Sequence, residues 1–259
     1  MMRTLLAILL FTLSTGAQAI GGKVAVGGTT AMGGSPTTSA TWTVVHYTTP
    51  TGGGGSAWDC NTTCAAFSLG YTVPSGDAIA LCVSLGANAY VLSADNTYGT
   101  WVSAATVPGL KAYQSSATEA SSCAYIITTA SVSTITPGYN VDAAGYAHIY
   151  HLHKSSGTIS AETVPTATTS TSCGTVGSPC ASPNVTITGA NDAIISVATF
   201  GNSACTVAAP YGSISIDSSG DASAQQLNTI SGTGASWTQG TACPTAAAAQ
   251  FAGLSLAFK

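Results

Sequence analysis

Three of the four histidines of this chain stand in one short segment, at a spacing that a strand could use for metal binding. They are His148, His151 and His153. On a strand, His151 and His153 point to one face and His148 to the other. Two histidines on one face can share a metal ion if another strand supplies a third ligand. The alternatives are histidines hydrogen-bonded in the core or at its rim, and an exposed strand.

Aromatic side chains are the second group that could bind a ligand. The chain has four tryptophans and ten tyrosines, and exposed aromatic rings often stack on sugar rings at binding sites. Trp101 and Trp237 each stand near a turn, so they are the expected surface pair. The alternative for both residues is packing in the core.

The acidic residues do not form a recognisable catalytic pattern. Sugar hydrolysis needs two carboxyl groups facing one cleft, and the nine acids here are scattered. No Gly-x-Ser-x-Gly turn and no phosphate-binding glycine loop with a lysine occurs. Residues 217–221, Asp-Ser-Ser-Gly-Asp, offer oxygen ligands for calcium, although a plain turn is the expected role of such residues. The sequence therefore predicts neither an enzyme nor a cofactor.

The cysteines predict disulfides. There are eight, an even number, and no Cys-x-x-Cys pair that would favour a metal. The simplest pairing closes two short loops and joins the remaining cysteines within each half of the chain. The expected bonds are Cys60–Cys64, Cys82–Cys123, Cys173–Cys180 and Cys205–Cys243.

The first residues predict export. One arginine, a short apolar run over residues 5–13 and an Ala-x-Ala ending at Ala19 are typical of a signal peptide, with cleavage expected after Ala19. The apolar run is about half the ~20 residues that a membrane-spanning helix needs. Residues 20–40 are rich in glycine and threonine and read as a leader or an edge segment, and residues 41–259 as one folded domain. We therefore expect a secreted, extracellular or cell-surface protein.

The amino-acid composition limits the classes of partner that the protein is expected to bind. Charged residues make up 5% of the chain, apolar residues 45%, and the mean hydropathy is +0.35, which indicates a folded domain rather than a disordered one. After residue 3 there is no arginine and there are four lysines. Such a surface does not neutralise phosphates, so we expect no nucleic-acid partner, and we expect no membrane insertion. Low charge also permits self-association.

Short apolar runs separated by Gly, Pro, Asn and Asp predict the fold. Examples are residues 78–85, 124–130, 147–153, 185–188, 193–200 and 254–258. Strands at this spacing predict an all-β protein with a single antiparallel, jelly-roll-like sandwich. An internal repeat is also present: residues 75–81 match 190–196, and residues 146–154 match 251–259. The repeat predicts two strand sets of similar order that share one core.

The repeat also predicts which side chains are buried. In the last strand, Leu254, Leu256 and Phe258 alternate with small residues and should point inward. In the alignment of residues 146–154 with 251–259, the matching positions are Ile149, His151 and His153. Two histidines would then stand where the second half has Leu and Phe.

Several short motifs resemble a widespread group of secreted β-sandwich domains of bacteria and phages whose function is unresolved. They are residues 76–79 (Gly-Asp-Ala-Ile), residues 95–101 (Asp-Asn-Thr-Tyr-Gly-Thr-Trp) and residues 257–259 (Ala-Phe-Lys). The resemblance implies a jelly-roll or immunoglobulin-like sandwich over about residues 41–259 and assigns no catalytic residue. The eight cysteines and the histidine run depart from that group's pattern.

These observations predict a secreted, non-catalytic binding or adhesion module for an extracellular surface or a glycan. The alternative is a structural subunit of an extracellular filament or matrix, in which the N-terminal segment of one copy pairs with the sheet edge of another. A hydrolase of unknown type is the third reading.

Overall fold

The apolar run at residues 78–85 forms the central strand of a sheet, β4 (Ala78–Leu85), with every side chain buried. This is a computed structural model, and it describes residues 40–48, 58–60, 63–93, 97–173, 180–200, 206–207, 211–216, 222–238 and 249–259. All of these lie in one compact unit, Ser39–Lys259. The predicted signal peptide, residues 20–39 and residues 217–221 lie outside the described residues.

The first half of the chain builds an antiparallel sheet in the order β1-β10-β4-β7-β6, with β2 paired to β10. Its other strands are β1 (Trp42–Thr48), β2 (Trp58–Cys60), β6 (Lys111–Gln114), β7 (Glu119–Ile127) and β10 (Ala143–Lys154).

The second half builds an antiparallel sheet in the order β11-β18-β13-β16-β15. Its strands are β11 (Thr168–Cys173), β13 (Asp192–Phe200), β15 (Gly212–Ile216), β16 (Ala222–Thr229) and β18 (Ala249–Phe258). Numbered along the chain within each half, the five main strands follow the same spatial order: first, fifth, second, fourth, third. The internal repeat therefore corresponds to two sheets of one topology.

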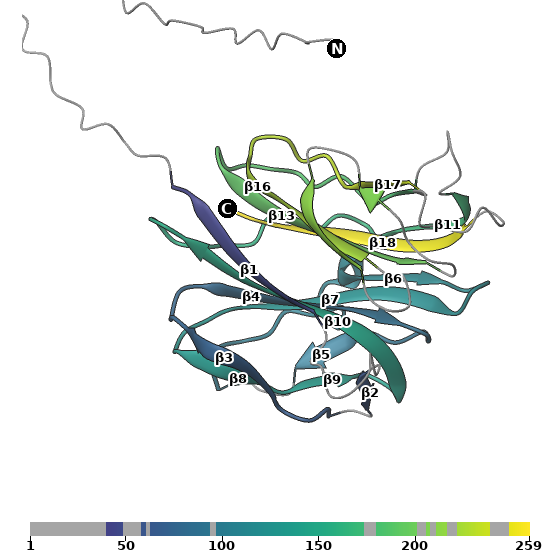
Figure 1. The fold of residues 1–259 in the computed structure, drawn as a ribbon, viewed down its shortest axis with the longest axis horizontal. Helices are drawn as coiled ribbons and strands as arrows, with labels where there is room; N and C mark the ends of the chain where they lie inside the picture. The colour runs from purple at the N-terminus through teal and green to yellow at the C-terminus, as the bar shows by residue number, and fades with distance from the viewer. Residues whose placement is uncertain are drawn as a thin grey trace, which may run out of the picture. The chain divides into compact units, whose positions relative to one another are not determined.

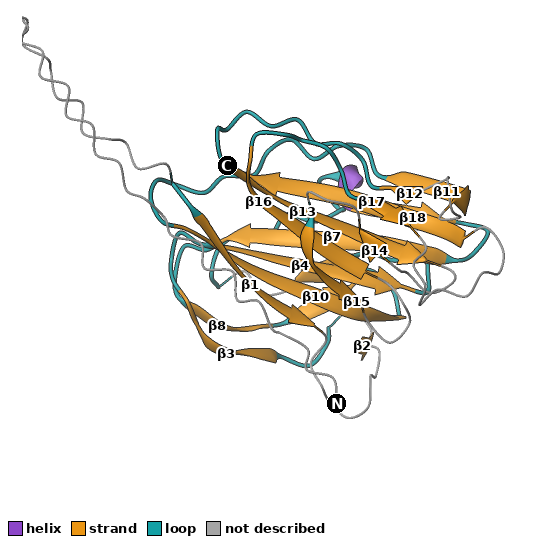
Figure 2. Ribbon diagram, turned by 45° about the horizontal axis from the view of Figure 1, so that its top comes forward, coloured by secondary structure: helices purple, strands orange, loops and turns teal. Residues whose placement is uncertain are grey.

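The two sheets face each other and bury a shared core between them, as the layers of Figures 1 and 2 show. The first sheet contributes Ala78, Ala80, Tyr150 and Leu152 among others, and the second contributes residues of β13 and β18 such as Ile195 and Phe258. Smaller antiparallel pieces pack on the outer faces and bury two further clusters. On the first sheet these are β3 (Phe67–Val73), β8 (Val132–Ile135), β5 (Val91–Ser93) and β9 (Pro137–Tyr139); on the second they are β12 (Cys180–Ala181), β14 (Thr206–Val207) and β17 (Ser236–Thr238).

This architecture confirms the predicted all-β antiparallel sandwich. One short 3₁₀ helix, η1 (Pro108–Leu110), precedes β6. Within the described part of the chain, no helix is long and apolar enough to cross a membrane.

The predicted burial of the last strand is right for the second half and wrong for the first. Leu254, Leu256 and Phe258 do point into the shared core. However, Ala78 pairs with Leu152 just as Ala193 pairs with Phe258, so Leu152 is the residue equivalent to Phe258. The alignment of residues 146–154 with 251–259 was one residue out of register, and a one-residue slip exchanges the two faces of a strand.

The disulfide prediction is confirmed for Cys82–Cys123. These residues lie directly opposite each other on β4 and β7, with their Cα atoms 4.0 Å apart, and their side chains belong to the shared core. Cys64 and Cys180 are also disulfide-bonded, to side chains outside the described ones. The predicted bond Cys205–Cys243 lies outside the described residues, as do the side chains of Cys60 and Cys173.

Candidate functional site

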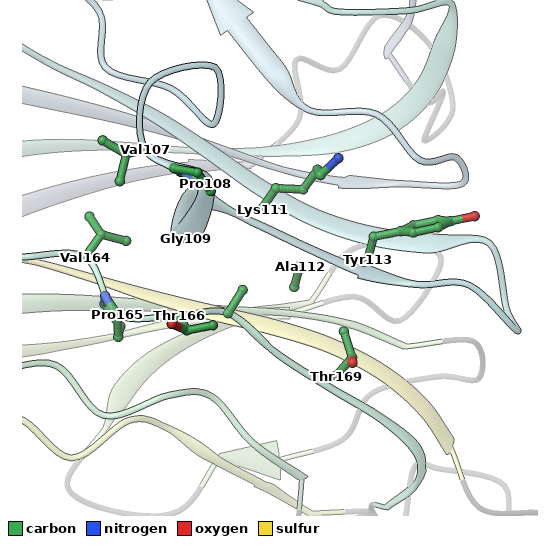
Figure 3. A pocket seen from close by; sticks show the side chains of 11 residues that line it. Val107, Pro108, Gly109, Lys111, Ala112, Tyr113, Val164, Pro165, Thr166 and Thr169 are labelled. Atoms are coloured by element: carbon green, nitrogen blue, oxygen red, sulfur yellow. The ribbon is translucent and has the colours of Figure 1, made fainter.

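A surface groove of about 420 Å³ lies where the two halves of the chain meet. One wall is η1 and β6 of the first half, and the other is the segment that leads into β11 of the second half (Figure 3). The lining residues are Val107, Pro108, Gly109, Lys111, Ala112, Tyr113, Val164, Pro165, Thr166, Ala167 and Thr169.

The two walls of the groove are held at fixed distance by contacts at both ends. At one end, Gly109 packs so closely against the carbonyl oxygen of Pro165 that a Cβ atom at this position would overlap it. At the other end, the Gln114 side-chain amide donates a hydrogen bond of 2.8 Å to the carbonyl oxygen of Ser170. A groove that is braced in this way needs little reordering to accept a ligand.

Lys111 supplies the one charge among the residues that line the groove, all of which the structure describes. Its ammonium group donates to Asn88 Oδ1 at 3.0 Å and lies 5.4 Å from the centre of the Tyr90 ring. Tyr113 borders the groove, with its ring packed in part against the cluster on the outer face of the first sheet, and Thr166 and Thr169 add hydroxyl groups (Figure 3). An aromatic face beside hydroxyl groups is suited to stacking and hydrogen bonding with a polar ring.

The structure brings His151 and His153 together with Asp77, a residue 74 positions earlier than His151. His151 Nε2 lies 2.7 Å from Asp77 Oδ2, and His153 Nδ1 lies 2.9 Å from Oδ1. Asp77 and His151 are buried, and the His153 side chain is half exposed. His148, fully buried, is on the opposite face of β10.

These contacts form a chain of hydrogen bonds that includes Tyr71. An ionised Asp77 only accepts, so we assign the N–H groups to His151 Nε2 and His153 Nδ1. His151 Nδ1 then accepts from the Tyr71 hydroxyl, 3.0 Å away. His151 Nε2 and His153 Nδ1 are directed at the carboxylate. The described residues contain no group of three or more His, Cys, Asp or Glu placed to hold a metal ion. The arrangement is that of hydrogen-bonded histidines at the rim of the core.

The predicted surface pair of tryptophans is wrong for Trp237. Trp237 is 1% exposed, and its indole N–H donates to Ser182 Oγ at 2.9 Å. Trp101 is half-buried against the cluster on the outer face of the first sheet, whereas Trp237 belongs to the cluster on the outer face of the second. The two rings therefore lie on opposite sides of the sandwich and form no common platform.

A second group of titratable side chains, not predicted from the sequence, lies at the start of β13. Asp192 is fully buried and faces Glu162, which is also buried. Glu162 Oε1 accepts from the backbone N–H and the hydroxyl of Thr188, at 2.8 and 2.7 Å. The Lys259 ammonium lies 3.4 Å from Glu162 Oε2. The one signal for this site was the repeat, which aligns Asp192 with Asp77.

The surroundings of Asp192 and Glu162 shift the pKa values of their carboxyl groups in opposite directions. Burial and the adjacent charge of Glu162 raise the pKa of Asp192. Burial alone would raise the pKa of Glu162 too, but the Thr188 hydrogen bonds and the Lys259 charge together lower it. Asp192 is therefore the member of the pair that holds a proton more readily.

In comparisons with known proteins, no protein-family model, no curated protein and no solved structure matches the chain. The resemblance to secreted β-sandwich domains of bacteria and phages therefore stays a prediction.

Proposed function

We propose that this protein is a secreted, non-catalytic binding module that takes an extracellular glycan in the groove between its two halves. The groove carries the proposal, because its lining combines threonine hydroxyls with a tyrosine ring and one lysine at its border, and contacts at both ends hold its walls in place. Sugars are bound by stacking on aromatic faces and by hydrogen bonds to their hydroxyl groups. A chain with few surface charges also favours a neutral or weakly charged polar ligand over a polyanion such as nucleic acid.

The groove also suits a polymer more than a small enclosed ligand. It is open to the surface and runs along β6, so an extended chain could lie in it without entering the core (Figure 3). Because its two walls come from different halves of the chain, binding there would depend on the packing of the two sheets against each other.

The proposal is tested on a glycan array with the chain that lacks the predicted signal peptide and has its disulfides formed. We expect wild-type protein to bind a defined set of glycans, and we expect Tyr113→Ala to lose about fivefold in affinity because stacking contributes about 1 kcal/mol. Tyr146→Ala is the matched control, since Tyr146 is also half-buried but lies outside the groove. Equal loss in both variants, or no binding to any glycan by the wild type, would contradict the proposal.

Self-assembly is the second candidate, favoured by the sheet edges. Among the described strands, β1 and β6 each pair with one neighbour in the first sheet, as do β11 and β15 in the second. An open edge can accept a strand from another copy. Light scattering on the mature chain, with and without residues 20–40, tests this candidate: a monomer in both cases excludes it.

A further inference from the structure

Three side chains with complementary chemistry meet at the end of the second sheet. Lys259 supplies an amine, Asp192 a buried carboxyl group, and Glu162 a second carboxyl group that contacts both. They come from three separate segments: the end of β18, the start of β13 and the loop before β11. The site is distinct from the groove, whose lining includes none of the three.

Lys259 and Asp192 are cross-strand neighbours. Ala193 pairs with Phe258 in the antiparallel ladder, so the residues just beyond, Asp192 and Lys259, face each other at its end. The Asp192 carboxyl carbon and the Lys259 Cβ atom lie 2.9 and 3.1 Å from one point above Gly189. The flexible four-carbon stem of a lysine can therefore bring its amine to the Asp192 carboxyl by rotation about its own bonds.

The backbone of Lys259 is fixed in place. Its N–H donates to the Ser160 carbonyl at 2.9 Å, and its carbonyl accepts from the Ser160 N–H at 3.1 Å. The ammonium group donates to Thr188 Oγ1 at 2.7 Å and lies 3.4 Å from Glu162. The amine is thus held beside a carboxylate whose other oxygen is anchored by Thr188.

Asp192 and Glu162 favour different protonation states, and these suit different roles in amide formation. Asp192 is fully buried, and its raised pKa favours the neutral acid, whose carbonyl carbon is open to attack. Glu162, with its lowered pKa, favours the carboxylate, which can accept a proton from the amine. A buried carboxylic acid, a lysine and a proton acceptor are the components that amide formation requires.

We propose that Lys259 and Asp192 are joined by an intramolecular isopeptide bond, which the chain forms by itself with Glu162 as the proton acceptor. The Lys259 ammonium gives one proton to Glu162, and the neutral Nζ attacks the Asp192 Cγ atom. Glu162 passes that proton to the departing hydroxyl, which leaves as water, and takes a second proton from the nitrogen. One C–N bond forms, one C–O bond breaks, one water is released, and no oxidant or reductant is needed.

The bond ties the start of the central strand of the second sheet to the end of its neighbour. It closes a loop of roughly 70 residues, which removes chain entropy from the unfolded state as a disulfide does. In the first half of the chain, β4 is joined covalently to β7 by Cys82–Cys123, so each half would have a covalent link at its central strand. Unlike a disulfide, an amide bond survives reducing conditions.

Intact-mass spectrometry of the reduced, mature full-length chain tests the proposal. We expect a mass lower by one water than the sequence predicts, and a linked peptide that contains both Asp192 and Lys259 after proteolysis. Lys259→Arg and Glu162→Gln should restore the full mass. Asp192→Asn distinguishes the chemistry, because attack on an amide would release ammonia in place of water.

Lys154→Arg is the matched control. The charge of Lys154 acts on Asp192, and its ammonium lies over the Trp42 ring. The loss of water should persist in this variant. A wild-type mass equal to the sequence mass overturns the proposal. So does a loss of water that persists in Lys259→Arg, with circular dichroism used to confirm that each variant is folded.

Discussion

Asp77 and Asp192 occupy equivalent places in the two halves of the chain: Asp77 directly precedes β4, Asp192 is the first residue of β13, and both are buried. Their neighbours across the ladder are also alike: Thr128 donates its backbone N–H to the Asp77 carbonyl, and Thr229 pairs with Asp192. A buried carboxyl group needs partners. The first half supplies two imidazoles, and the second half supplies a lysine and a glutamate.

The Asp77 site should contribute to stability through its hydrogen bonds. Asp77→Ala leaves the buried His151 ring without its acceptor, which costs about 1–3 kcal/mol. Asp77→Asn keeps one acceptor oxygen and should cost less. Urea unfolding monitored by circular dichroism measures the change, with Asp142→Ala, at an exposed position, as the control. An Asp77→Ala variant as stable as the control would show that the histidines find other partners.

Where no amide bond joins it to Lys259, Asp192 should make the free energy of unfolding fall as pH rises. The pKa of Asp192 is raised from 3.8 by burial and by Glu162, so the folded state binds its proton more tightly than the unfolded state does. Stability from this group is then complete below pH 3.8 and is lost as pH rises through the folded-state pKa.

Asp192→Asn should abolish that loss, since an amide does not titrate. The comparison belongs in a Lys259→Arg background, which retains the cation and cannot form an amide. Unfolding free energies over a pH series measure it. The contribution of Glu162 to stability has the opposite pH dependence, because its lowered pKa makes stability fall with decreasing pH. If Lys259→Arg and the double variant Lys259→Arg/Asp192→Asn show the same pH slope from 3.8 upward, Asp192 does not act as described.

The Cys82–Cys123 bond should account for a large share of stability. It closes a loop with a sequence separation of 41 residues, for which chain entropy predicts about 3–4 kcal/mol. Replacing both cysteines by alanine should lower the unfolding free energy by this amount without changing the strand content. The second half has Val197 opposite Ser223 at the equivalent place, so the bond is not required by the topology itself. A loss below about 1 kcal/mol would mean that the unfolded state is already compact.

Tyr150 and Ser223 form a polar link across the shared core. The Tyr150 hydroxyl donates to Ser223 Oγ at 2.7 Å, both residues are fully buried, and burial raises the pKa of Tyr150 despite this hydrogen bond. Tyr150→Phe should cost about 1–2 kcal/mol, because a buried hydroxyl loses its donor. The double variant with Ser223→Ala should cost less than the two single variants together, since both polar atoms are then removed. Additive costs in this double-mutant cycle would exclude direct coupling.

The sequence by itself determined much of the local structure. Strand β4 begins and ends at the residues predicted, because a run that is apolar apart from Ser84, between a turn and a glycine, admits few alternatives. The repeat correctly indicated two strand sets of one order. Cys82–Cys123 followed from pairing the remaining cysteines within each half. By contrast, residues 185–188 were predicted to be a strand and are an irregular segment.

Tertiary structure decided which face of each strand is buried and which distant residues meet. In β10 both faces are apolar enough to be buried, so the pattern of alternation did not fix the register, and one residue of slip placed His151 and His153 on the wrong face. Three features depend on the packing of segments far apart in the chain. They are the contact of the histidines with Asp77, the groove between residues 107–113 and 164–169, and the contact of Glu162 with Lys259. Trp237 is buried because β17 packs on the second sheet. The sequence around Trp237 does not predict this packing.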